Sequence, residues 1–103
     1  MNKQVEEILS ILQEECAEVI QIISKIRRFG EYNVHPNTPT STNLLRLHEE
    51  LGDVIAMIEL LSANDYINVK HIHMLKHKKF TKLKQWSGID INYDKLDNAR
   101  VVK

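Results

Sequence analysis

The stretch QEECAEVIQIISKI, residues 13–26, places acidic residues where an amphipathic helix normally carries apolar ones. When successive residues are set about 100° apart, the apolar side chains around it form one stripe. Glu15 falls inside this stripe, and Glu18 lies at its edge. The stripe consists of Val5, Ile8, Leu9, Leu12, Cys16, Val19, Ile23 and Ile26, widened by Ile11 and Ile22. A carboxylate that faces a core needs a partner.

A second stretch, residues 44–61, repeats the pattern in a separate predicted helix. Glu50 projects from its apolar arc, and Asp53 lies one turn further on. The arc consists of Leu47, Leu51, Val54, Met57, Ile58 and Leu61. Residues three apart are neighbours on a helix, so Glu15 pairs with Glu18 as Glu50 pairs with Asp53. If the two helices pack together, four carboxylates meet.

Four carboxylates in one place repel one another, and burial strengthens the repulsion, so the cluster needs cations or protons. An all-oxygen ligand set favours a hard cation, with Mg²⁺ as the first choice and Mn²⁺ as the second. Magnesium sites of this kind commonly keep positions for substrate phosphates. The alternative is that these acids are ordinary salt-bridge partners on charged helices, which their places among apolar residues disfavour.

The two acidic stretches also resemble motifs of a known family. EECAE (residues 14–18) and ELGD (residues 50–53) are similar to the EExxE and ExxD motifs of the MazG-like all-α nucleoside triphosphate pyrophosphohydrolases, relatives of the dimeric dUTPases. The resemblance covers roughly residues 5–86. The spacer of 31 residues between the motifs, residues 19–49, is longer than the family leads us to expect.

This resemblance implies an enzyme that cleaves a nucleoside triphosphate to the monophosphate and pyrophosphate. The expected metal ligands are Glu15, Glu18, Glu50 and Asp53. The metal would neutralise the phosphates and lower the pKa of a bound water. Glu15 would thereby share in catalysis, and Glu14, on the polar side of the pair, would orient or deprotonate the water.

The composition fits one all-α domain. The chain has 103 residues, of which 43% are hydrophobic and 27% charged, which are ordinary globular values. We expect a bundle of three main helices in residues 1–86, followed by a tail in residues 87–103. No apolar run approaches the roughly 18 residues of a membrane span, and no signal peptide is expected. The single cysteine, Cys16, suits a reducing cytoplasm and is predicted to be buried.

Capping residues predict where the helices begin and end. The first helix should start after Asn2 and end near residue 28, with Gly30 just beyond it. The second should be capped by Thr42 or Asn43 and stop near residue 64. The third, capped by Asp65, should span residues 66–86. Its apolar face consists of Val69, Ile72, Leu75, Phe80, Leu83 and Trp86.

The segment EYNVHPNTPTST, residues 31–42, has two prolines and no apolar period, which predicts a loop. By resemblance to the family, it would border the nucleotide pocket; a flexible connection without a role is the alternative. Two lysines of the third helix would contact phosphates, unless their long stems simply reach from the stripe edge to water. The expected substrate-binding residues are Arg27, Arg28, Phe29, Tyr32, His35, Lys76 and Lys79.

The neutral net charge conceals an asymmetry. Residues 1–65 hold 5 Lys/Arg against 11 Asp/Glu, a balance of −6, while residues 66–103 hold 9 against 3, a balance of +6. Opposite patches of this kind favour association of helices or subunits. Three helices are too few to enclose a deep nucleotide pocket, so we expect a second copy to complete the bundle, as a homodimer or homotetramer.

Other functions fit the sequence less well. His73 and His77 have a zinc-binding spacing but lack an acidic or cysteine third ligand, and Cys16 has no basic neighbour on its helix that would activate it. Residues 66–86 carry six lysines and three histidines without an acid, so a nucleic-acid-binding or partner-binding helical protein is the main rival. A nucleotide sensor without turnover would have the same ligands.

Overall fold

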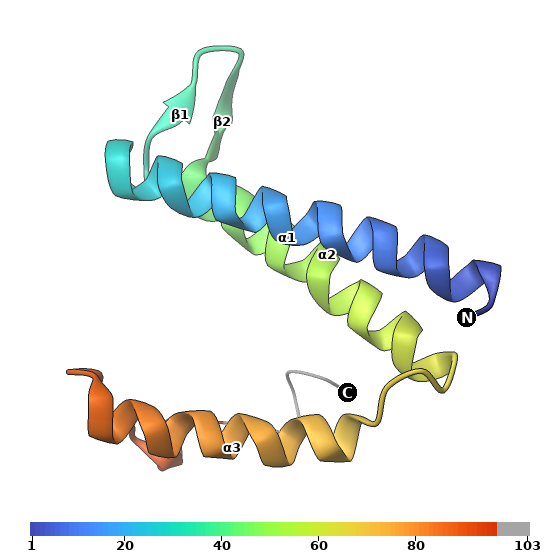
Figure 1. Ribbon diagram of the computed structural model, residues 1–103. Coiled ribbons are helices and arrows are strands. Elements are labelled where there is room, and N and C mark those ends of the chain that lie inside the picture. The colour runs from blue at the N-terminus through green and yellow to red at the C-terminus, as the bar shows by residue number, and fades with distance from the viewer. Residues whose placement is uncertain (97–103) are drawn as a thin grey trace.

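Three long helices dominate the fold, as the sequence predicted. The computed structural model describes residues 1–96 (Figure 1). A short β-hairpin joins the first two helices, and a 3₁₀ turn lies near the end of the described chain. The elements in order are α1 (Lys3–Phe29), β1 (Val34–His35), β2 (Thr38–Thr42), α2 (Asn43–Ala63), α3 (Val69–Trp86) and η1 (Tyr93–Lys95).

The ends of α1 and the start of α2 are set by the predicted caps. The Asn2 side chain accepts a hydrogen bond from the Val5 N–H at 2.7 Å, and Thr42 Oγ1 accepts one from the Leu45 N–H at 3.1 Å. At the other end of α1, the N–H of Gly30 donates to the Ile26 carbonyl at 2.8 Å. Gly30 has φ 93°, a value that a residue with a Cβ rarely adopts.

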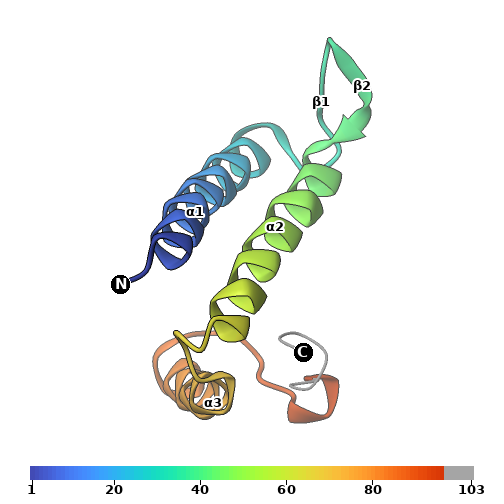
Figure 2. The same cartoon turned by 90° about the vertical axis from the view of Figure 1, so that its right-hand side faces the viewer.

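The hydrophobic core lies between α1 and α2, which pack together along their lengths (Figures 1 and 2). Val5, Ile8 and Leu61 are buried at one end, and Ile22 is buried further along α1. The residues packed against the first three are Leu9, Leu12, Met57 and Ile67. The core therefore follows one side of the predicted stripe.

The other side of that stripe is uncovered, which corrects one prediction. Cys16 is exposed rather than buried. Ile23 and Leu51 are 43% and 42% exposed, although both belong to the predicted apolar faces. The reason is that α1 and α2 each pack mainly against one partner helix, whereas their apolar stripes are wide enough for two.

The predicted loop between α1 and α2 is instead a β-hairpin. Strands β1 and β2 are antiparallel, with a bulge between Val34 and His35. The strands were not predicted because the segment contains prolines and lacks an alternation of apolar and polar residues. The threonines of β2 are β-branched, however, and favour an extended backbone. Asn43, only 5% exposed, anchors the hairpin: its Nδ2 donates to the Gly30 carbonyl at 3.0 Å, and its N–H donates to the Asn33 carbonyl at 3.0 Å.

The third helix begins three residues later than predicted. Asp65, the expected cap, has φ 57° and closes α2 instead: its N–H donates to the Ser62 carbonyl and the N–H of Tyr66 to the Leu61 carbonyl, both at 3.0 Å. The cap of α3 is Asn68, whose side chain accepts from the His71 N–H at 3.1 Å. Asp65, with its left-handed backbone, therefore ends α2, and α3 starts at Val69.

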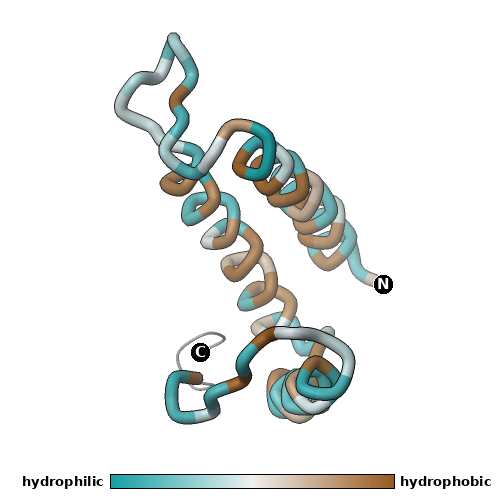
Figure 3. Tube along the Cα trace, turned by 90° about the vertical axis from the view of Figure 1, so that its left-hand side faces the viewer, coloured by the Kyte–Doolittle hydropathy of each residue, from teal (hydrophilic) through white to brown (hydrophobic). Residues whose placement is uncertain are grey.

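Helix α3 lies apart from the α1–α2 pair (Figures 1 and 2). None of its residues is buried, and Figure 3 shows apolar positions along α3 as well as along α1 and α2. Residues 87–96, the first part of the predicted tail, return along α3, where the Tyr93 ring meets Phe80 edge-on at 6.5 Å. The rest of the tail lies outside the described residues. No helix in the described part of the chain is both long and apolar enough to cross a membrane.

The hairpin anchor gives a stability prediction. Replacing Asn43 by Ala removes the donor to the Gly30 carbonyl at a buried position, so the free energy of unfolding should fall by about 1–2 kcal/mol in urea denaturation. Asn33→Ala is the matched control, because the exposed Asn33 contributes only its backbone here, and it should change stability by less than about 0.5 kcal/mol. Equal effects of the two variants would show that the Asn43 side chain is not the anchor.

Candidate metal centre

Carboxylates from α1 and α2 meet at the middle of the helix pair. Oxygens of Glu15, Glu50 and Asp53 all lie within 4.8 Å of one another. Glu18 belongs to the same cluster, since its carboxyl group interacts with those of Glu15 and Glu50. The packing of two helices thus brings together acids that are 32 or more positions apart in sequence.

Two of these oxygens have no partner. With the carboxyl groups of the cluster ionised, Glu15 Oε2 and Glu50 Oε2 are buried and accept no hydrogen bond from any residue of the described chain. Buried polar atoms are nearly always satisfied, and each exception requires an explanation. A hard cation among the carboxylates would supply the missing interaction, so the donor set fits Mg²⁺ or Mn²⁺.

The cluster also shifts the pKa values of its acids. Burial raises the pKa of Glu15, and the negative charges of Glu18 and Asp53 raise it further. The pKa of Glu50 rises to about 7, first through a hydrogen bond with Glu18, then through burial and the charges of its neighbours. A hydrogen bond between two carboxyl groups requires a proton on one of them. A shared proton, or a cation in its place, therefore relieves the repulsion within the cluster.

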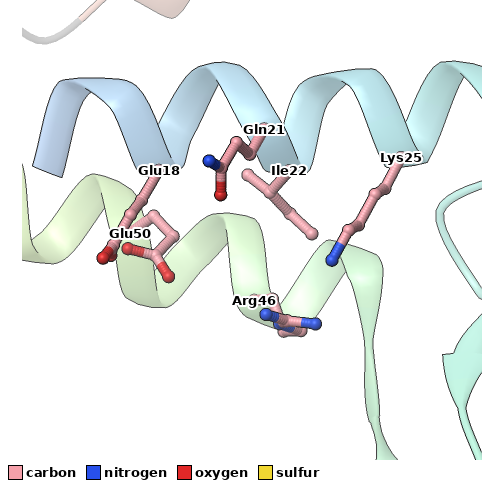
Figure 4. Close-up of a pocket in the computed structure, with 6 residues that line it drawn as sticks. All are labelled: Glu18, Gln21, Ile22, Lys25, Arg46 and Glu50. Atoms are coloured by element: carbon pink, nitrogen blue, oxygen red, sulfur yellow. The ribbon is translucent and has the colours of Figure 1, made fainter. Parts of the chain in front are cut away.

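A cleft of about 180 Å³ opens beside the cluster (Figure 4). Glu18 and Glu50 lie toward one end of it, and the charged groups of Lys25 and Arg46 lie toward the other. Both cations were missed in the sequence, although a signal was present. Lys25 is seven residues after Glu18 and Arg46 is four before Glu50, so each shares the helix face of an acid. Gln21 and Ile22 complete the lining.

A second cleft, of about 150 Å³, lies between the hairpin and the helix ends. Phe29 and His35, two of the residues expected to bind substrate, line it. Lys25 and Arg46 belong to its lining as well, so the two clefts adjoin. The remaining lining residues are Asn33, Val34, Pro36 and Asn43.

Other predicted residues of α1 and the hairpin lie outside both clefts. Glu14 is exposed beside the carboxylate cluster and is not among its converging oxygens. Arg27 and Arg28 are exposed in the last turn of α1, and the Arg28 guanidinium lies 4.9 Å from the centre of the Phe29 ring. Tyr32 is 73% exposed. None of these four residues is part of the lining of either cleft.

Lys76 and Lys79 lie on α3, away from the carboxylates of the same chain. Lys76 Nζ is 3.3 Å from Nδ1 of His73, and Lys79 is exposed. Because α3 does not pack along the α1–α2 pair, the described residues do not bring these lysines to the cluster. Their role in substrate binding remains a prediction.

Comparison with known proteins identifies one family. The family model of the MazG nucleotide pyrophosphohydrolase domain matches residues 3–86, which include α1, the hairpin, α2 and α3. The comparison with curated proteins and the comparison with solved structures found no match.

The raised pKa of Glu50 predicts how stability depends on pH. The folded protein binds this proton more tightly than the unfolded chain, whose carboxyl has a pKa near 4.5. Without divalent cations, the stabilisation from protonation is therefore present at pH 4.5 and lost as the pH rises to about 7. Melting temperatures measured in EDTA should fall over this range by several degrees.

The matched variants for this measurement are Glu50→Gln and Glu49→Gln. The first removes the titrating group and should flatten the pH profile between 4.5 and 7. The second removes an exposed neighbouring acid and should leave the profile as in the wild type. A profile that is equally steep in Glu50→Gln would contradict the assignment.

Proposed function

The chain belongs to the MazG nucleotide pyrophosphohydrolase family. We propose that it hydrolyses a ribo- or deoxyribonucleoside triphosphate to the monophosphate and pyrophosphate. The observation that carries this proposal is the meeting of carboxylates from α1 and α2 around two buried, unpartnered oxygens. Beside them a cleft with two cations leads to a second cleft lined by Phe29 and His35. Acids, cations and an aromatic ring in this order suit a metal-bound nucleotide.

In this proposal Glu15, Glu18, Glu50 and Asp53 hold Mg²⁺, or Mn²⁺ in its place. A bound cation supplies charge neutralisation for the phosphates and a more acidic water. Hydrolysis adds the elements of water across the P–O–P bridge between the α- and β-phosphates. The proton released in this step needs an acceptor, and Glu14, an exposed carboxylate beside the cluster, takes this role.

The substrate is held by residues around the two clefts. The Phe29 ring stacks on the base, and the His35 ring stacks on it or forms a hydrogen bond with it. Tyr32, which precedes β1, also contacts the base. Arg27 and Arg28, on the last turn of α1, contribute positive charge near this end. Lys76 and Lys79 contact phosphates from α3 of a neighbouring copy, since α3 does not reach the carboxylates of its own chain.

We further propose that the protein is a homodimer or homotetramer in which a second copy covers the apolar surface. On α3, Met74, Leu75 and Trp86 are 63%, 48% and 79% exposed, and Leu51 and Leu60 of α2 are also exposed. A single chain rarely leaves so many large apolar side chains in water. The acidic α1–α2 pair and the basic α3 would attract each other between copies. The free Cys16 thiol suits the reducing cytoplasm.

Removal of single acids tests the reaction. Glu18→Ala and Asp53→Ala should each lower pyrophosphate release from a panel of ribo- and deoxynucleoside triphosphates with Mg²⁺ by about 100-fold or more. In EDTA the same variants should melt at a temperature no lower than the wild type, because like-charge repulsion is relieved. Glu49→Gln should retain normal turnover.

The panel also separates the enzyme from its rivals. Metal-dependent pyrophosphate release, without salt-dependent retention on DNA, supports the hydrolase. Retention on DNA with no release would instead favour a nucleic-acid-binding protein. Triphosphate binding by the wild type without any turnover would identify a sensor.

The assembly is tested separately by light scattering. The wild type should have the mass of two or four chains, and replacing Leu75 by Glu should shift the protein toward a lower mass, because a charge on the apolar surface opposes its burial. Asn37→Glu, an exposed position on the hairpin and away from α3, is the matched control for an added acid. An active wild-type monomer would contradict the proposed assembly.

A further inference from the structure

Lys25 and Arg46 lie where the two clefts meet. They are the two residues that line both the cleft beside the carboxylates and the cleft beside the hairpin. Arg46 is half-buried, and Lys25 reaches the same space from α1 (Figure 4). A cation from each helix thus faces a region between the acidic cluster and the aromatic pocket.

Neither cation is used by the fold itself. Among residues 1–96, neither forms an ion pair with a carboxylate, although Glu18 and Glu50 line the same cleft. Arg46 is one helical turn, about 6 Å along the axis, from Glu50, and Lys25 is two turns, about 10 Å, from Glu18. Two cations without a structural partner, directed into one cleft, form a site for an anion.

The order of the groups indicates which anion. From the acids outward, the clefts present carboxylates, then the two cations, then Phe29, Val34 and His35. A nucleotide whose terminal phosphates lie at the carboxylate-bound cation and whose base enters the hairpin cleft has its α-phosphate and sugar in between. The guanidinium of Arg46 can donate two parallel hydrogen bonds to the non-bridging oxygens of that phosphate, and the ammonium group of Lys25 can neutralise their charge.

We propose that Lys25 and Arg46 bind the α-phosphate and so hold the nucleoside monophosphate part of the substrate. This inference rests on the proposed function. It adds that the site has two parts, one on each side of the bond that is cleaved. The cations retain the monophosphate product, while the carboxylate cluster and its metal retain pyrophosphate. The two products therefore have separate binding determinants.

Calorimetric binding of each product tests this division. Lys25→Ala and Arg46→Ala, titrated in Mg²⁺ with the common ribo- and deoxyribonucleoside monophosphates, should each weaken binding of the preferred monophosphate by about tenfold or more. Affinity for pyrophosphate should stay within about twofold of the wild type. Arg46→Lys keeps the charge and should restore most of the lost affinity.

Two controls distinguish phosphate binding from damage to the metal centre. Stabilisation by Mg²⁺ in thermal melts should persist in Lys25→Ala and Arg46→Ala, because removing a cation near the carboxylates does not weaken their attraction for metal. Lys78→Ala, an exposed lysine on α3, should bind both products normally.

The outcomes decide the inference independently of turnover. Weaker monophosphate binding with unchanged pyrophosphate binding supports it. Equal or greater loss of pyrophosphate affinity, no change in either affinity, or no binding of any monophosphate by the wild type would overturn it. Absence of pyrophosphate release by a wild type that still binds monophosphates through Lys25 and Arg46 would overturn the proposed reaction and leave this site standing.

Discussion

Repulsion among the carboxylates at the α1–α2 interface is the constraint on which the site depends. Glu15 and Glu50 each place a buried oxygen where no donor of the described chain reaches it, and an oxygen of Asp53 lies within 4.8 Å. Such an arrangement opposes folding unless protons or cations compensate the charge. The pKa of Glu50 is raised because its hydrogen bond with Glu18, its burial and the charges of its neighbours all disfavour its ionised form. The fold therefore carries an unfavourable interaction at its centre, as sites shaped for a ligand commonly do.

Local features of this protein could be predicted from its sequence because local chemistry decides them. Asn2, Gly30 and Thr42 set helix ends through bonds to residues three or four positions away. The acids at positions 15, 18, 50 and 53 were visible as interruptions of an apolar stripe, and packing of the two stripes brings them together. Periodicity predicted the helices and the faces that carry the acids, and the meeting of the acids followed once the two helices were expected to pack together.

Features that depend on distant partners could not be predicted in the same way. Cys16 and Leu51 belong to apolar stripes, yet both are exposed. The width of an apolar stripe does not reveal how many helices of the same chain pack against it. Asp65 is an acceptable cap by type, but its left-handed backbone ends α2. In the sequence, Lys25 and Arg46 resemble ordinary surface cations. Only the folded position of the hairpin shows that both residues line two adjoining clefts.

The hairpin is held against both helices through one residue, Asn43. Asn43 is the first residue of α2, bonds to Gly30 at the end of α1 and to Asn33 before β1, and lines the hairpin cleft. The same helices carry Arg46 one turn after Asn43 and Lys25 about one turn before Gly30. The hairpin is therefore anchored to the two helices that present both cations. The position of the hairpin cleft relative to the carboxylates depends on this anchor.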